Sequence, residues 1–307
     1  MHQLDVNSAF LQGSLKEEVY MTQSPGLGDT QYPNHVCKLH KSIYGLRQAP
    51  RAWHDGLKAF ITSHGFTTSK SDLSLFIYAT GPIIAYFLVY VDDLLLTGND
   101  AQFLHNFIHS ISNRFSLKNM GTPHCFLGIE LIPTNKGLLL SQHRFNREIL
   151  EKFDMASAKP APTPLSPTAT LTLNDGTPTT DSTHHRKIIG VLQYINLTRT
   201  DLSIAINKLS QFMHKPISLH LQHLKRLLRY LKATINFGIF LKQPSSFHLY
   251  AFTDADCGGN VEDRTSTSAY LIFLESNPTS WLSRKQHTVA RLQLRLNTVQ
   301  WPLQLLN

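Results

Sequence analysis

Two adjacent carboxylates, Asp92 and Asp93, interrupt the most apolar stretch of the chain and constrain how that stretch folds. Ile83–Val91 precedes them and Leu94–Leu96 follows them, and both flanks have the composition of β-strands. Neighbouring carboxylates repel each other, and burying an unpaired charge costs several kcal/mol. The pair therefore needs either open solvent at a hairpin tip or a bound cation, and the apolar flanks favour the cation.

A third carboxylate, Asp5, has a similar apolar setting between Leu4 and Val6. Two strands that bring Asp5, Asp92 and Asp93 to one point could hold two divalent cations about 3.5–4 Å apart, which activate a hydroxyl nucleophile and stabilise a leaving group. Mg²⁺, or Mn²⁺ in its place, suits such oxygen ligands. On spacing alone, this metal site is a hypothesis.

Composition excludes several classes of protein. The chain has 307 residues, enough for one large or two ordinary domains, and a net charge of +8, which favours nucleic acid or acidic lipid as a partner. Ile83–Val91 is about half the ~20 residues of a membrane-spanning helix, so no membrane is expected. The 3 cysteines are far apart, which indicates neither a disulfide framework nor a zinc site and favours a reducing, intracellular compartment.

Periodicity predicts a mixture of helices and strands, divided by a segment rich in proline and threonine at residues 156–183. Apolar residues at helical spacing predict helices over Pro50–Gly65, Gln102–Phe115, Arg186–Met213 and His220–Thr234. Runs rich in β-branched and aromatic residues predict strands at Leu75–Tyr78, Ile83–Thr97, Phe247–Thr253, Ser268–Leu274 and Thr279–Leu282. His220 and His223 are expected on the surface because no third metal ligand accompanies them, and His184 and His185 are expected in solvent because they border the Pro/Thr-rich segment.

Several motifs follow one another in a recognisable order. They are LDVNSAFLQGSLKEEVYM at residues 4–21, VCKLHKSIYGLRQAPRAWHDGL at 36–57, YVDD at 90–93, FLGIEL at 126–131, TDADCGG at 253–259 and DRTSTSAYLIFL at 263–274. This order resembles the reverse transcriptase region of copia-type long-terminal-repeat retrotransposon Pol polyproteins, followed by the start of their ribonuclease H domain. The resemblance implies an RNA-directed DNA polymerase, with an RNA template, a DNA primer or RNA–DNA hybrid, and dNTPs as partners.

The resemblance also implies roles for individual residues. Asp5, Asp92 and Asp93 match the palm carboxylates, so they would be catalytic and bind two Mg²⁺ ions. Phe10 matches the aromatic residue that crowds the sugar 2′ position and favours deoxynucleotides. Gly45, which alone could also be an ordinary turn residue, would let the backbone approach template and nucleotide closely.

Further site residues carry over from the same motifs. Arg47, Gln48 and Arg51 neighbour Gly45 and would contact template or nucleotide, and Phe126, Leu127 and Gly128 would form the primer grip. Asp254 matches the first ribonuclease H carboxylate, whereas Asp256 and Asp263 are expected in loops. The basic stripe, Lys225, Arg226, Arg229 and Lys232, is either a solvated helix face or, as the family favours, a contact to duplex phosphates.

The predicted fold class is α+β. We expect an N-terminally truncated palm and thumb over 1–155, a Pro/Thr-rich linker over 156–183, a helical connection over 184–245 and a partial ribonuclease H-like α/β domain over 246–307.

The motifs depart from the family pattern at both ends. The family has a fingers region before its first palm motif, here at residue 4, so we expect the fingers to be missing and the strand of Asp5 to leave a sheet edge uncovered. Residues 282–307 contain no Asp or Glu where the family has an acidic helix, and a frameshift near Arg291 would explain this difference. We therefore expect no ribonuclease H activity and weak or no polymerase activity. The alternatives are a non-catalytic nucleic-acid-binding remnant and an unrelated two-metal nuclease.

Overall fold

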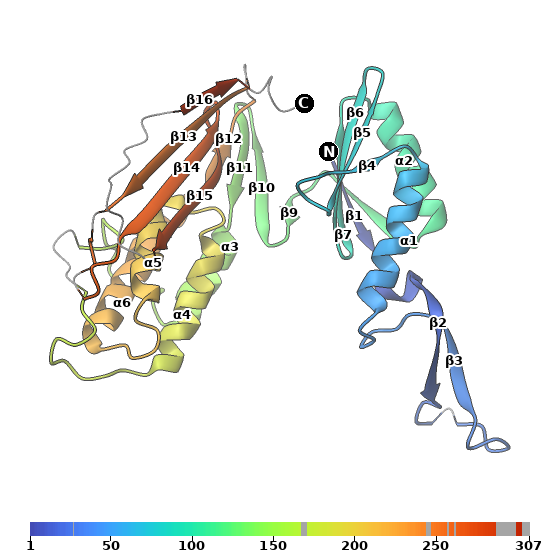
Figure 1. Cartoon of the computed structure of the whole chain (residues 1–307), viewed down its shortest axis with the longest axis horizontal. Helices are drawn as coiled ribbons and strands as arrows, with labels where there is room; N and C mark the ends of the chain where they lie inside the picture. The colour runs from blue at the N-terminus through green and yellow to red at the C-terminus, as the bar shows by residue number, and fades with distance from the viewer. Residues whose placement is uncertain are drawn as a thin grey trace. The chain divides into compact units, whose positions relative to one another are not determined.

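The computed structural model divides into two compact units, Met1–Pro123 and His124–Asn307, each described here by itself (Figure 1). The structure describes residues 1–26, 28–166, 171–243, 247–256, 258–260 and 262–286, and the backbone of 299–302. The predicted α+β class is confirmed, with helices packed on antiparallel sheets in both units. The boundaries expected at residues 155, 183 and 245 stay predictions.

The first unit is built on a six-stranded sheet of order β4-β5-β6-β7-β1-β8, with a separate two-stranded sheet, β2-β3. Its elements are β1 (His2–Val6), the 3₁₀ helix η1 (Ala9–Gln12), β2 (Ser14–Thr22), β3 (Val36–Lys41), α1 (Ala49–Ser63), β4 (Thr67–Thr68), β5 (Leu75–Thr80), β6 (Ile83–Tyr90), β7 (Asp93–Gly98), α2 (Ala101–Arg114) and β8 (Leu117–Gly121).

Local sequence explains the two helices of this unit. Pro50 occupies the first turn of α1, where its fixed φ favours a helix start, and the Asp100 carboxylate caps α2 by accepting a hydrogen bond from the Phe103 amide at 2.7 Å. Both helices bury one apolar stripe in a common core with the inward residues of the sheet. This core includes Trp53, Leu57 and Ile61 of α1, Leu104, Phe107 and Ile111 of α2, and Leu4, Phe87, Leu94 and Leu96 of the strands.

The second unit contains two four-stranded antiparallel sheets, of order β12-β11-β10-β9 and β15-β14-β13-β16. Its elements are β9 (Cys125–Phe126), β10 (Ile129–Thr134), β11 (Gly137–Ser141), α3 (His143–Lys152), α4 (Ser182–Ile195), the 3₁₀ helix η2 (Thr200–Leu202), α5 (Ser203–Ser210), α6 (Ser218–Ala233), β12 (Ile239–Leu241), β13 (His248–Ala255), β14 (Thr267–Leu274), β15 (Asn277–Lys285) and β16 (Val299–Pro302). Within the described parts of the chain, no helix is long and apolar enough to cross a membrane.

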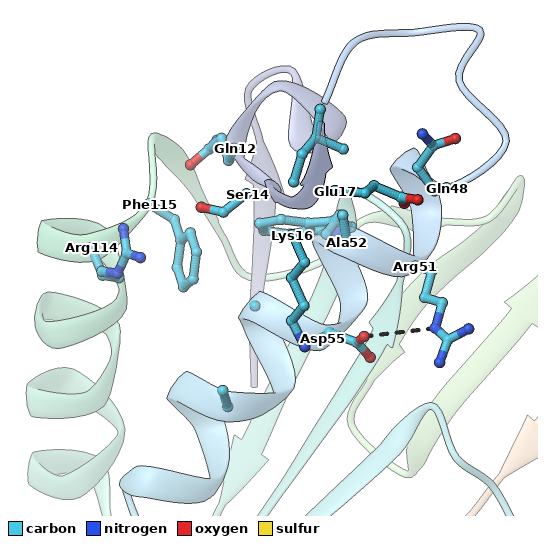
Figure 2. A pocket seen from close by; sticks show the side chains of 14 residues that line it. Gln12, Ser14, Lys16, Glu17, Gln48, Arg51, Ala52, Asp55, Arg114 and Phe115 are labelled. Carbon is cyan, nitrogen blue, oxygen red and sulfur yellow. Dashed lines mark ion pairs between the residues drawn. The ribbon is translucent and has the colours of Figure 1, made fainter. Parts of the chain in front are cut away.

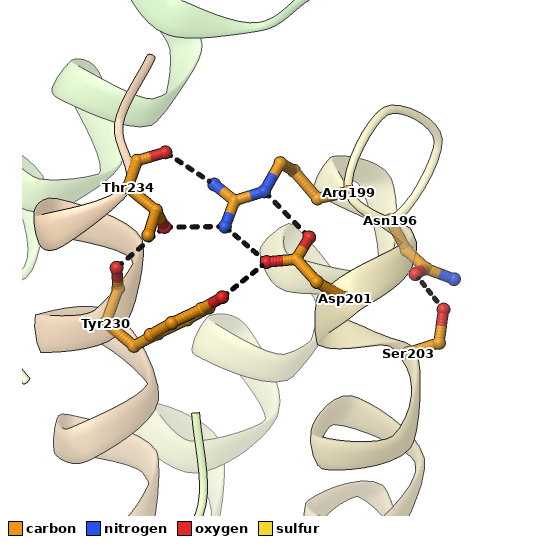
Figure 3. A network of polar contacts seen from close by, with 6 residues as sticks. All are labelled: Asn196, Arg199, Asp201, Ser203, Tyr230 and Thr234. Carbon is orange, nitrogen blue, oxygen red and sulfur yellow. Dashed lines mark hydrogen bonds and ion pairs between the residues drawn. The ribbon is translucent and has the colours of Figure 1, made fainter. Parts of the chain in front are cut away.

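The single helix expected over Arg186–Met213 is wrong, because α4 ends at Ile195 and α5 begins at Ser203. Between them the side chain of Arg199 is only 1% exposed. It donates to both carboxylate oxygens of Asp201, at 2.9 and 2.7 Å, and to Thr234 at the end of α6 (Figure 3). A buried guanidinium requires such a set of acceptors, and satisfying them turns the chain out of the helical path.

The Pro/Thr-rich segment packs closely against α6 over part of its length. Ala161 is buried, and its amide donates to the carbonyl of Arg229 at 3.2 Å. Leu165 and Leu171 lie against the core formed by α3 to α6. The described residues of this segment therefore contribute to the core of the second unit, although their composition is typical of an exposed linker.

Candidate active site

The Asp92–Asp93 pair lies where β6 turns into β7. Tyr90 and Asp93 are direct partners across the hairpin, so Val91 and Asp92 form a two-residue turn. Val91 has a φ of +56°, at a position where the common two-residue turns prefer glycine or asparagine. A β-branched residue in the left-handed region costs roughly 1–3 kcal/mol, so surrounding contacts must hold this turn.

Two hydrogen bonds restrain consecutive carbonyls of the turn. The Val6 amide of β1 donates to the Asp92 carbonyl at 2.9 Å, and the Trp53 indole N–H of α1 donates to the Val91 carbonyl at 2.7 Å. The turn is therefore tied both to the neighbouring strand and to the helix layer beneath the sheet.

Asp5 lies beside this turn because β1 is an interior strand that pairs with β7 on one side and β8 on the other. Asp5 is the direct partner of Asp93 on β7 and of Lys118 on β8. Leu4 and Val6 face the core, so the alternation of a strand places Asp5, Asp93 and Lys118 together on the opposite face of the sheet. The expectation that the strand of Asp5 leaves an edge uncovered is wrong, because β8 pairs with it. The short sequence Leu117–Gly121 has little strand pattern, which is why β8 and Lys118 were not predicted.

Electrostatics indicate that the carboxylates act on one another. Partial burial raises the pKa of Asp93, and the charges of Asp92 and Asp5 raise it further, while a hydrogen bond from Gln3 opposes the shift. A nearby cation would relieve this repulsion, and carboxylate oxygens are suitable ligands for Mg²⁺. In the residues that the structure describes, however, no group of three or more Asp, Glu, His or Cys side chains is arranged as a preformed metal site.

Phe10 lies in η1, shortly after Asp5 along the chain. Its ring packs partly on the core and meets the ring of Tyr44 edge-on, with 5.2 Å between the ring centroids. The buried Ser42 hydroxyl donates to the Phe10 carbonyl. Gly45 has a φ of +95° with open space around it, so the backbone conformation favours a glycine there and no protein atom crowds it.

Two of the predicted template-contacting residues line one pocket of the first unit (Figure 2). Gln48 and Arg51 share this cavity of about 450 Å³ with Lys16, Glu17, Arg114 and other side chains. Arg51 forms an exposed ion pair with Asp55 at 3.8 Å. Phe10, Gly45 and Arg47 are not among the residues that line the pocket. Lys16 and Arg114 were not singled out in the sequence, because each is an isolated cation there.

The predicted primer-grip residues form a tight turn between β9 and β10 in the second unit. Leu127 and Gly128 both have positive φ, +49° and +75°. The Tyr194 hydroxyl of α4 donates to the Leu127 carbonyl at 2.5 Å, and a Cβ at Gly128 would collide with the same hydroxyl. Tyr194 thus positions this turn. The sequence does not indicate this role because Tyr194 and the turn are far apart along the chain.

Three residues of the basic stripe contact the Pro/Thr-rich segment. Arg226 donates to the Thr163 hydroxyl at 2.7 Å, Arg229 to the Lys159 carbonyl at 2.5 Å and Lys232 to the Ala158 carbonyl at 2.8 Å. Lys225 is exposed. The contacts made by the two arginines and Lys232 give them a structural role, whether or not they also contact phosphate.

Asp254 lies on β13, opposite Ala269 of β14, and lines a cavity of about 300 Å³ together with Asp201. Asp256 and Asp263 lie in loops, as predicted. Asp263 pairs with Lys285 at 2.6 Å, and hydrogen bonding to this ammonium lowers the pKa of Asp263 to about 2. The tail in which the frameshift is expected lies mostly outside the described residues.

The expectation of surface histidines is wrong for His185 and His220, both of which are fully buried. The His220 ring stacks on Phe212, accepts a hydrogen bond from the Ile217 amide at 3.1 Å, and lies 3.0 Å from the Thr172 carbonyl. His185 lies 3.3 Å from the Leu209 carbonyl. Backbone groups satisfy both ring nitrogens of His220 but only Nε2 of His185, whose Nδ1 is buried without a hydrogen-bond partner in the described part of the chain.

Comparisons with known proteins agree with the motif order. A protein-family model described as "Reverse transcriptase (RNA-dependent DNA polymerase)" matches residues 1–167. The chain is 50% identical over 291 residues to the Retrovirus-related Pol polyprotein from transposon RE1 of Arabidopsis thaliana, covering 95% of this chain and 20% of the relative. It is 33% identical over 301 residues to the polyprotein from transposon TNT 1-94 of Nicotiana tabacum, covering 94% of this chain and 22% of that one.

A shorter relative matches over most of its length. The Putative transposon Ty5-1 protein YCL074W of Saccharomyces cerevisiae is 29% identical over 286 residues, which is 92% of each chain. The chain belongs to the reverse transcriptase family, in its copia-type retrotransposon Pol branch, which confirms the resemblance seen in the motifs. It spans about a fifth of the length of the plant polyproteins.

Proposed function

We propose that the first unit is the palm of an RNA-directed DNA polymerase and that Asp5, Asp92 and Asp93 are its catalytic carboxylates. The observation that carries the proposal is the pairing of Asp5 with Asp93 across β1 and β7, next to the turn that bears Asp92. Asp5 and Asp93 on one sheet face, together with Asp92 in the adjoining turn, would supply the oxygen ligands that nucleotidyl transfer requires. The raised pKa of Asp93 supports their mutual proximity.

Asp5 and Asp92 would bind both Mg²⁺ ions, and Asp93 would support the site. When bound, the ions favour deprotonation of the primer 3′-hydroxyl and neutralise charge on the pyrophosphate leaving group. The chain itself would position the Asp92 carboxylate, because the hydrogen bonds from Val6 and Trp53 orient the Val91–Asp92 turn before substrate arrives. Lys118, on the same sheet face, adds a positive charge beside Asp5.

Substrate recognition would be divided among the remaining predicted residues. The Phe10 ring, held by Ser42 and Tyr44, would meet a ribonucleotide 2′-hydroxyl and favour dNTPs. Gly45, Arg47, Gln48 and Arg51 would contact template or nucleotide, and the pocket that Gln48 and Arg51 share supports a template path beside α1. In the second unit, the turn Phe126–Gly128 would grip the primer as part of the thumb, and the exposed Lys225 would contact duplex phosphate.

We also propose that β13 to β15 form a ribonuclease H-like remnant around Asp254. Asp254 alone matches a ribonuclease H carboxylate, and Asp201 in the same cavity is paired with Arg199, so this part of the chain would lack the acidic groups that two metal ions need and with them ribonuclease activity. Degradation of the RNA strand of a labelled hybrid by the purified chain would contradict this proposal.

Primer extension on an RNA template tests the polymerase assignment. The assay compares the parent chain, Asp92→Asn and the control Asp29→Asn, whose carboxylate lies in the loop between β2 and β3. Synthesis by the parent and the control that disappears in Asp92→Asn supports the proposal, even if the synthesis is weak, since the sequence predicts weak or no activity. Binding to the RNA–DNA hybrid without extension by any variant would contradict it and favour the non-catalytic nucleic-acid-binding remnant.

A further inference from the structure

Trp53 connects helix α1 to the Val91–Asp92 turn. It lies on the buried face of α1, and only 2% of its surface is exposed. Its ring meets Phe115 edge-on at 5.3 Å, and its indole N–H donates to the Val91 carbonyl at 2.7 Å. Packing alone does not account for this hydrogen bond, because a phenylalanine ring packs in a core without any N–H donor.

The Val91 carbonyl needs a fixed partner because Val91 is in an unfavourable conformation. Its φ of +56° is rare for a β-branched residue, so the free turn would relax toward other backbone angles. Rotating the Val91–Asp92 peptide would move the Asp92 backbone and with it the carboxylate. The bond from Trp53 opposes this rotation at one carbonyl, and the bond from the Val6 amide opposes it at the next.

We propose that Trp53 is a positioning residue that fixes the Val91–Asp92 turn through its indole N–H and so sets the position of the Asp92 carboxylate. This inference rests on the proposed polymerase function for its catalytic consequence. The structural part of the proposal, that the indole hydrogen bond restrains the Val91–Asp92 turn, does not depend on the polymerase function. The indole N–H therefore acts on the Asp92 carboxylate through the turn, while the Trp53 ring also lines the pocket that Gln48 and Arg51 share.

The test uses Trp53→Phe in the full chain, which keeps an aromatic ring and removes the donor. Trp281→Phe is the matched control, because the Trp281 indole also donates to a carbonyl, that of Asn196 at 3.0 Å, in the other unit. Hydrogen exchange of two neighbouring amides gives a readout that does not depend on activity. The Val6 amide donates to the turn at Asp92, whereas the Asn7 amide donates to Ser116, away from it.

We expect Trp53→Phe to speed exchange of the Val6 amide by about 5–30-fold while leaving the Asn7 amide close to its parent rate. Trp281→Phe should change neither rate. In primer extension, Trp53→Phe should lower kcat by about 10–100-fold with little change in the KM for dNTP, since the defect is in placement and not in binding. Adding Val91→Asn, which tolerates positive φ better, should restore part of the loss.

Each part of the proposal can fail separately. Unchanged Val6 exchange in Trp53→Phe, or equal acceleration at Val6 and Asn7, would overturn it and leave Trp53 as a packing residue. Selective acceleration at Val6 with undiminished kcat would overturn the link to Asp92. If the parent chain itself gives no extension, the polymerase assignment fails, and the exchange data still decide whether Trp53 restrains the turn.

Discussion

Asp5 and Asp93 are direct partners on β1 and β7, so their carboxylates share one face of the sheet. Like charges placed opposite each other on neighbouring strands destabilise the folded state. The pKa of Asp93 is raised first by burial and then by the charges of Asp92 and Asp5, so the ionised carboxylate destabilises the folded state. The first unit therefore carries a charge arrangement that its own stability does not favour.

Replacing Asp93 should stabilise the metal-free protein at neutral pH. Because the folded-state pKa of Asp93 is raised, its ionised form is penalised above that pKa, and the penalty is absent below the unfolded value of about 3.9. We expect Asp93→Asn to raise the melting temperature at pH 7 and the gain to shrink as the pH falls toward 4. Thermal melts in a metal chelator, with Asp29→Asn as control, measure this effect. An equal gain at both pH values would point to packing instead of charge.

Replacing Gly128 with alanine should destabilise the second unit. The Gly128 φ of +75° and the Tyr194 hydroxyl beside it both oppose a Cβ. We expect Gly128→Ala to lower the free energy of unfolding by about 1–3 kcal/mol, measured in urea. Gly176→Ala is the control, because Gly176 has a φ of +84° but open space. Combining Gly128→Ala with Tyr194→Phe should cost less than the sum of the single changes, and strict additivity would contradict the proposed collision.

The second unit should lose stability in mild acid through His220. Its Nδ1 accepts from the Ile217 amide, so a protonated ring would lose that bond, and burial lowers the pKa of His220. His185 and His223 oppose protonation and Asp175 favours it. Since the folded state prefers the neutral ring, stability is full above the unfolded pKa of about 6.5 and falls as the pH drops below it.

His220→Ala should lower the free energy of unfolding by about 1 kcal/mol at pH 7.5 and flatten its decline between pH 7 and 5. Urea unfolding at several pH values provides the measurement. The exposed His214, replaced by alanine, is the control. A pH dependence that persists in His220→Ala would assign it to other groups.

The four cations of the basic stripe should separate into two behaviours. Lys225→Ala should reduce the slope of log affinity against log salt by about 1 for an RNA–DNA hybrid, with stability unchanged. Arg229→Ala should instead lower stability, because it removes a bond to the Lys159 carbonyl. Fluorescence anisotropy at several salt concentrations, together with thermal melts, distinguishes the two. Identical behaviour of both variants would refute the division.

The parts of the fold that the sequence predicted well are those whose pattern is local. The helices α1, α2 and α6 each bury one regular stripe, and the hairpin of β6 and β7 follows from two apolar runs around Asp92. The motif order also brought Asp5 and Asp93 into one proposed site, and the strand register places them on one sheet face.

The features that escaped prediction depend on partners far along the chain. The burial of His220 requires the Thr172 carbonyl, and the break between α4 and α5 accompanies the bonds from Arg199 to Thr234. The role of Trp53 depends on a carbonyl 38 residues away. Polar groups such as these look like surface residues until the distant backbone atoms that satisfy them are known.

The pairing of Asp5 with Asp93 also determines which kinds of genetic change the site survives. Side chains alternate along β1, so loss or gain of one codon anywhere between His2 and Val6 shifts one part of the strand by one position, and between Asp5 and Val6 it turns the carboxylate toward the core. Most substitutions at exposed strand positions leave the register untouched. Among transposon copies that accumulate mutations, a small in-frame insertion or deletion in this strand should therefore indicate that the carboxylate pair is lost, even in a copy whose sequence has otherwise diverged little.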